Sequence, residues 1–183
     1  RIVINRGSAG SSKSFSLCQL MLFKFFNEHN KKFFICRKNL PALRQSCYAV
    51  LNQLASEYRV RDQIMEEKVH MNWYYGSNII HFGGLDDPEK VKSSSWNYIW
   101  MEESTEFTYE DFKILLLRLR EPTKDGNKNQ FFLSFNPIDE FHWIKTKVLE
   151  NPEYDAEEIH STYKDNPFLD EDARHDLDNL EKI

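Results

Sequence analysis

The first chemistry that the sequence suggests is phosphate binding, carried by a run near the start of the chain, Arg6-Gly7-Ser8-Ala9-Gly10-Ser11-Ser12-Lys13-Ser14. In a phosphate-binding loop, backbone N–H groups surround phosphate oxygens, a lysine reaches the β- and γ-phosphates, and the next hydroxyl binds Mg²⁺. The motif therefore predicts a catalytic Lys13, a metal-binding Ser14, and nucleotide contacts from Gly7, Ser8, Ala9, Gly10, Ser11, Ser12, Lys13 and Ser14. The usual pattern has a glycine at the position of Ser12, so a Ser/Gly-rich turn is the alternative interpretation.

A pair of carboxylates, Glu102 and Glu103, follows the apolar run Asn97–Met101. An ATPase needs one acid at the end of a neighbouring strand to hold Mg²⁺ through water, and a second carboxylate to orient or deprotonate the attacking water. We assign the metal to Glu102 and the water to Glu103. Aspartate is more usual at the first position, and two solvated acids at a strand end are the alternative.

Three further polar residues are weaker candidates. Asn136, in Ser134-Phe135-Asn136-Pro137, could sense the γ-phosphate or the attacking water, although Asn-Pro is also a frequent turn dipeptide. Arg118 and Arg120 follow the carboxylates by one expected helix and could stabilise the charge that develops in phosphoryl transfer, one of them by completing the active site of a neighbouring subunit. A helix C-terminus also favours cations, and the spacing alone favours that structural role.

The elements that must position these residues alternate along the chain. Short apolar runs predict strands at 2–4, 33–36, 96–101, 131–135 and 159–163, and a hairpin within 69–82. Helical spacing predicts helices at 15–26, 40–58, 109–120 and 143–149, a short capped helix at 85–92, and a weakly helical tail at 169–183. This order indicates an α/β domain with a mainly parallel central sheet flanked by helices and an antiparallel hairpin added to it. Ligands of such sheets bind beyond the carboxyl ends of the strands, where the candidate residues are expected.

Composition narrows the class of protein. The chain has 183 residues, which suits one domain, and its net charge of −5 argues against a broad basic face that clamps nucleic acid. Cys18, Cys36 and Cys47 lack metal-site spacing and are expected to be buried free thiols. No apolar run is long enough to span a membrane, because Lys24 interrupts the longest one. The chain opens inside a strand, so we expect residues to precede it and a further domain to follow.

Taken in order, these stretches resemble the large terminase subunit, the DNA-packaging motor of tailed bacteriophages. The resemblance covers nearly the whole chain and rests on several motifs together, none of which is specific alone. They are 6–14, 34–38, 84–93, Ile99-Trp100-Met101-Glu102-Glu103-Ser104-Thr105-Glu106-Phe107, 115–120 and 134–137.

The resemblance implies a P-loop NTPase domain of the additional-strand, catalytic-glutamate class, with ATP and Mg²⁺ as its ligands. It implies that Ser134–Pro137 couples hydrolysis to DNA movement. Residues 1–150 would form the ATPase core and 151–183 a lid or the start of a linker. A C-terminal nuclease domain, and a segment before the loop that contacts adenine, would lie outside this chain. Many terminases have an arginine within the loop; Ala9 stands near that place here, which puts a cis-acting loop arginine in doubt. Arg6 precedes Gly7, so we expect its side chain to point away from the γ-phosphate.

The resemblance also implies partners and a location. These are double-stranded DNA, the portal protein, the small terminase subunit and other copies of the chain in a ring, usually a pentamer, although the isolated chain could be a monomer. The location would be the procapsid portal in the cytoplasm of the infected bacterium, with no role for a membrane. The function expected is a DNA-translocating ATPase. The alternatives are a P-loop kinase, another nucleotide-dependent DNA-processing ATPase, and a nucleotide-gated binding module with little turnover.

Overall fold

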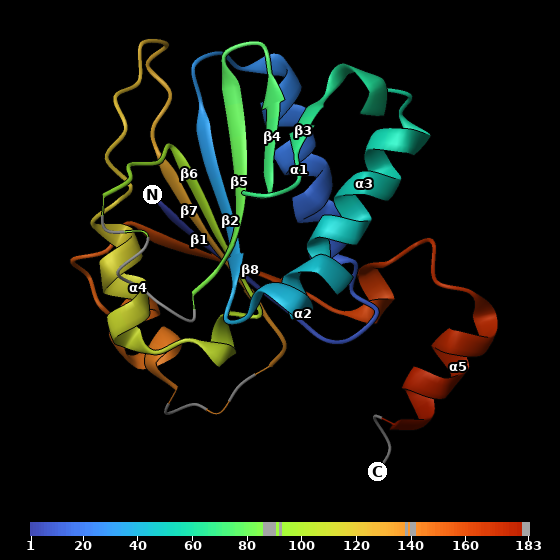
Figure 1. Cartoon of the computed structure of the whole chain (residues 1–183). Coiled ribbons are helices and arrows are strands. Elements are labelled where there is room, and N and C mark those ends of the chain that lie inside the picture. The colour runs from blue at the N-terminus through green and yellow to red at the C-terminus, as the bar shows by residue number, and fades with distance from the viewer. Residues whose placement is uncertain (86–90, 92, 138, 140–141, 181–183) are drawn as a thin grey trace.

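A computed structural model describes residues 1–85, 91, 93–137, 139 and 142–180 of the chain. Its centre is one eight-stranded sheet with the strand order β3-β4-β5-β2-β6-β7-β1-β8 (Figure 1). The strands are β1 (Ile2–Gly7), β2 (Lys32–Arg37), β3 (Met65–Glu67), β4 (Asn72–Tyr75), β5 (Asn78–Gly84), β6 (Tyr98–Glu102), β7 (Gln130–Phe135) and β8 (Ala156–Ser161).

The sheet is parallel except at one edge. Strands β5, β2, β6, β7, β1 and β8 pair in parallel, so their carboxyl ends share one edge of the sheet. The predicted hairpin is confirmed as β4 and β5, which pair antiparallel, and β3 extends it as a strand that the sequence did not predict. The α/β class and the mainly parallel sheet are therefore confirmed.

Helices cover both faces of this sheet (Figure 1). On one face lie α1 (Lys13–Asn27), α2 (Leu40–Gln45) and α3 (Cys47–Glu57); on the other lie α4 (Tyr109–Leu116) and the π-helix η4 (Ile144–Leu149). Short 3₁₀ turns are η1 (Arg61–Gln63), η3 (Ser104–Glu106) and η5 (Tyr163–Asp165), and α5 (Glu171–Leu180) comes last. None of the helices in the described ranges is long and apolar enough to cross a membrane.

Successive side chains of a strand are buried in the two hydrophobic cores on opposite faces of the sheet. Val3 packs into the core beneath α1 and α3, whereas Ile2 and Ile4 pack into the core beneath α4 and η4. Successive residues of a strand point to opposite faces, so near-continuous apolar strands are what a sheet covered on both sides requires. The three cysteines are buried and free, as expected.

Several element boundaries differ from the sequence-based expectation. The helix predicted at 40–58 is two helices, because the backbone breaks at Ser46 (φ −105°, ψ −113°). The helix predicted at 109–120 ends at Leu116, after which the Arg118 carbonyl accepts a hydrogen bond from the Trp96 N–H at 2.8 Å. In both places the chain leaves the helix and contacts a segment that is distant in the sequence. The tail is helical from Glu171, and the short helix expected at 85–92 lies largely outside the described residues.

Candidate functional site

The carboxyl edge of the sheet brings together segments that are far apart in the sequence. The loop from Ser8 to Ser12 follows β1, Asn136 follows β7, and Glu102 ends β6 with Glu103 directly after it. Since β6, β7 and β1 are consecutive parallel neighbours, these segments lie side by side. The location predicted for the site, beyond the strand ends, agrees with this arrangement.

The loop itself has a sterically constrained backbone. A side chain at Gly7 would collide with Ser161, whose carbonyl oxygen lies 2.8 Å from the position of a Cβ, so this strand end admits only glycine. Gly10 (φ +76°) and Ser12 (φ +61°) are both left-handed. The second of these values explains why glycine is usual at the Ser12 position, since a left-handed backbone strains any residue with a Cβ.

Lys13, the first residue of α1, points toward the predicted coupling residue. Its Nζ donates a hydrogen bond to Asn136 Oδ1 at 2.7 Å. Burial lowers the pKa of Lys13, while the negative charges of Glu103 and Glu102 act in the opposite direction. Lys13 therefore interacts both with Asn136, through a hydrogen bond, and with the two carboxylates, through their charge.

Glu102 is a buried carboxyl group, with only 6% of its surface exposed. Burial raises its pKa; a hydrogen bond from Ser46 and the charge of Arg37 act against that rise. The Ser46 hydroxyl donates to Glu102 Oε2 at 2.5 Å, so the break between α2 and α3 places a donor on the carboxylate. The sequence does not predict a role for Ser46, because no local pattern connects it to a residue 56 positions later.

Glu103 stands at a strained turn. Its backbone is left-handed (φ +50°), and its side chain is half-buried. The next residue, Ser104, fixes the turn: its hydroxyl donates to the Met101 carbonyl at 2.7 Å and accepts the Ser134 N–H at 3.1 Å. Strained residues that the surrounding structure holds in place are common at active sites. The Ser104 hydrogen bonds hold the Glu103 backbone at the carboxyl ends of β6 and β7.

A cavity of about 300 Å³ opens over the loop, lined by residues from Ser8 to Phe15 and by Asn166. Asn166 is buried and donates from Nδ2 to the Gly10 carbonyl oxygen at 2.8 Å, which ties the segment after β8 to the loop. Asn166 was not among the residues predicted from the sequence. For a metal, the candidates Ser14 and Glu102 offer only oxygen donors, a donor set that suits Mg²⁺.

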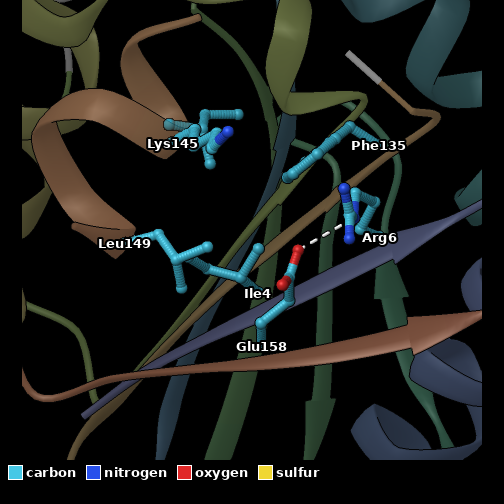
Figure 2. Close-up of a pocket in the computed structure, with 7 residues that line it drawn as sticks. Ile4, Arg6, Phe135, Lys145, Leu149 and Glu158 are labelled. Atoms are coloured by element: carbon cyan, nitrogen blue, oxygen red, sulfur yellow. Dashed lines mark ion pairs between the residues drawn. The ribbon is translucent and has the colours of Figure 1, made fainter. Parts of the chain in front are cut away.

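Arg6, the first residue of the motif, points away from this cavity. Its Nε lies 2.8 Å from Glu158 Oε1 on β8, and both side chains border a separate cavity of about 260 Å³ beside η4 (Figure 2). The expectation that Arg6 is directed away from the γ-phosphate position is consistent with this pairing.

The predicted arginines lie at the other edge of the sheet. The backbone of Arg118 and Glu121 forms hydrogen bonds with Trp96, which lies just before the start of β6. Glu102 and Glu103 lie at the opposite end of β6. The structure therefore does not bring Arg118 or Arg120 to Lys13 of the same chain. Action on a neighbouring copy, the role considered for them from the sequence, stays a prediction.

Comparisons with known proteins agree on one family. The family model described as phage terminase large subunit matches residues 1–183. The PBSX phage terminase large subunit of Bacillus subtilis (strain 168) is 29% identical over 198 residues, covering 96% of this chain and 45% of that protein.

Solved structures give the same result for the fold. The large terminase of a thermophilic bacteriophage superposes with a TM-score of 0.81 at 17% identity, over 97% of this chain and 44% of that one. The complex of the same terminase with ATP-gamma-S superposes with a TM-score of 0.79, also at 17% identity, over 97% of this chain and 43% of that one. The chain thus spans less than half the length of these proteins.

Proposed function

We propose that this chain, which belongs to the phage terminase large subunit family, is the ATP-hydrolysing domain of a viral DNA-packaging motor. The observation that carries the proposal is the convergence of a phosphate-binding loop, Lys13, Asn136 and the Glu102–Glu103 pair at one sheet edge. The ATP-gamma-S complex of the thermophilic phage terminase supports ATP as the ligand, because that protein has the same fold.

In this function the loop binds the phosphates of ATP. Backbone N–H groups of the loop and of the first turn of α1 donate to phosphate oxygens, and the helix N-terminus adds about half a positive charge. Lys13 Nζ moves from Asn136 to the β- and γ-phosphates. Asn136 then becomes available to the γ-phosphate or to the attacking water, so the occupied and empty states of the site differ at the predicted coupling motif.

Glu103 is the residue that activates water. Its half-exposed carboxylate accepts a proton from the water that attacks the γ-phosphate, and the turn held by Ser104 fixes its direction. Ser14 and Glu102 would hold Mg²⁺, which neutralises charge on the phosphate oxygens when it is bound. The Ser46 hydroxyl keeps the buried Glu102 side chain in one orientation.

We further propose a lid role within 151–183. There β8 adds a strand to the sheet beside β1, and the residues after it lie against the loop through Asn166 and Leu177. A Cβ at Gly10 would stand 3.0 Å from Leu177 Cδ1, so this side chain of α5 lies close to the loop. Movement of this segment is a means by which nucleotide binding could be transmitted to the rest of a longer protein.

The partners proposed follow from the family. They are double-stranded DNA, the portal protein, the small terminase subunit, a C-terminal nuclease domain and other copies of the chain in a ring at the procapsid portal, in the cytoplasm of the infected host. The net charge of −5 is consistent with transient rather than clamping contact with DNA.

The test is phosphate release from ATP with and without double-stranded DNA, measured for this chain and for the full-length protein. A packaging ATPase predicts hydrolysis in the absence of any second substrate, and stimulation by DNA in the full-length protein. A kinase would instead need an acceptor molecule, and a nucleotide-gated binding module would bind ATP with little turnover. Either of those results would contradict the proposal.

A further inference from the structure

The nucleotide cavity continues beyond the loop, on the side of β8. A second cavity of about 280 Å³ shares Ser11, Ser12, Lys13, Phe15 and Asn166 with the first. Its remaining lining includes the apolar side chains of Ile159, Pro167 and Phe168. The two cavities thus adjoin at the loop, and the second is the more apolar of the two, where it meets the segment after β8.

The strand order determines which end of a nucleotide would lie there. Along the carboxyl edge the sequence of elements is β6, β7, β1 and β8. Glu103 follows β6 and Asn136 follows β7, so the terminal phosphate belongs on that side of the loop. The other end of an extended nucleotide then runs toward β8, into the second cavity.

Phe168 is the exposed ring in that direction. It leaves 90% of its surface exposed, the largest exposed fraction among the large hydrophobic residues in the described part of the chain. Its backbone is nevertheless fixed next to the loop: the Phe168 N–H donates to Asn166 Oδ1 at 3.0 Å, while Asn166 Nδ2 donates to the Gly10 carbonyl oxygen at 2.8 Å. One buried amide therefore connects the loop to the residue that carries the ring.

We propose that Phe168 is the stacking platform for the nucleobase of the nucleotide bound at the loop. The proposal rests on the proposed function, because it takes the position of the phosphates from it. A nucleobase has an apolar face that stacks on aromatic side chains, and stacking would cover a ring that the protein itself leaves exposed. The adenine contact expected only from a segment before the loop would then be supplied, at least in part, by this chain.

The test compares a ligand that has a nucleobase with a phosphate ligand that has none. Binding of ADP and of inorganic tripolyphosphate, which has neither base nor ribose, is measured by calorimetry on the purified wild-type protein and on Phe168→Ala. We expect Phe168→Ala to weaken ADP binding by about tenfold, within the range measured for base–aromatic stacking, and to change tripolyphosphate binding by less than about twofold. Phe168→Trp should restore ADP binding, because it replaces one ring by another.

The matched control is Phe23→Ala, which removes an exposed ring (65%) from α1 outside this cavity and should leave the affinities for both ligands unchanged. Unchanged ADP binding in Phe168→Ala would overturn the proposal. An equal loss for ADP and tripolyphosphate would also overturn it, because Phe168 would then support the loop rather than the base. If the wild-type protein bound neither ligand, the proposed function would fail first, and the stacking role with it.

Discussion

Buried asparagines at one edge of the parallel sheet and charged groups at the other have different surroundings. At the amino edge, the buried Asn97 accepts the Lys32 N–H at 2.9 Å and donates to Asn129 Oδ1 at 3.0 Å. Asn78, also buried, accepts the Lys31 N–H at 2.8 Å and donates to the Phe25 carbonyl oxygen at 2.8 Å. The polar groups of both side chains are engaged, so this edge has the arrangement that stability requires.

At the carboxyl edge, by contrast, two charged groups have shifted pKa values and two residues have strained backbones. Glu102 is a carboxyl group whose pKa burial raises, Lys13 is an amine whose pKa burial lowers, and Glu103 and Ser12 have left-handed backbones. Such features destabilise a fold and persist where a function needs them. The comparison is consistent with a stabilising role for the amino edge and with the candidate site at the carboxyl edge.

The largest expected effect is a difference between alanine substitutions of two lysines, one at each edge of the sheet. Lys13→Ala should abolish ATP hydrolysis, because it removes the full positive charge that the loop supplies, while leaving the melting temperature nearly unchanged. Lys31→Ala, which removes a buried lysine (1% exposed side chain) paired with Asp125 at 2.8 Å, should lower the melting temperature and leave hydrolysis per folded molecule intact. Phosphate release and thermal unfolding measure both. Wild-type turnover in Lys13→Ala would contradict the assignment of the loop.

The next largest effect is a loss of turnover that leaves nucleotide binding intact. Glu103→Gln should lower turnover by about 10²–10⁴, the usual cost of losing a general base, and keep the affinity for ATP. Glu110→Gln, which alters an exposed acid of α4 beyond the candidate site, is the control and should retain wild-type turnover. Normal hydrolysis by Glu103→Gln would require the roles of Glu102 and Glu103 to be exchanged or abandoned.

A smaller effect is expected in stability and its pH dependence. Burial raises the pKa of Glu102 above its ordinary value of 4.5, so the folded protein binds this proton more tightly than the unfolded chain does. The group therefore costs stability as pH rises above about 4.5, until the folded carboxyl is ionised. Glu102→Gln should raise the melting temperature at neutral pH, because glutamine has no charge to bury, and lose that advantage near pH 4.

Thermal unfolding of Glu102→Gln and the wild-type protein from pH 4 to pH 8 checks this prediction. Glutamine keeps an oxygen for the Ser46 hydroxyl, so the contact between them is preserved. A stability difference that shrinks as pH rises would have the wrong sign and would contradict a raised pKa.

The smallest effect is expected for the arginines at the amino edge. Arg118→Ala and Arg120→Ala should change turnover of the single chain by less than about twofold, since neither residue lies at the loop of its own chain. If one of them acts on a neighbouring subunit, mixing either variant with Glu103→Gln in the assembled motor should partly restore activity. Mixtures no more active than the separate variants, while added wild-type subunits do raise activity, would leave both arginines with a role in their own subunit.

The difference between the edges also explains what the sequence could reveal. The apolar strands, the loop and the carboxylate pair are local patterns, and the parallel order then places Lys13, Glu102, Glu103 and Asn136 together. Ser46 and Asn166 were not predicted, because their partners lie 56 and 156 residues away and no local spacing records such contacts. The ends of α2 and α4 were missed for the same reason, since distant hydrogen-bond partners, and not helix propensity, determine where they stop.

The most direct test of the account is a crystal structure of the protein with ATP-gamma-S and Mg²⁺. The account predicts phosphates enclosed by the backbone N–H groups of Gly10 to Ser14, with Lys13 Nζ moved from Asn136 Oδ1, now 2.7 Å away, to the phosphate oxygens. The Glu103 carboxylate should face the γ-phosphate. A nucleotide bound elsewhere, or one bound at the loop while the Lys13–Asn136 hydrogen bond persists, would contradict it.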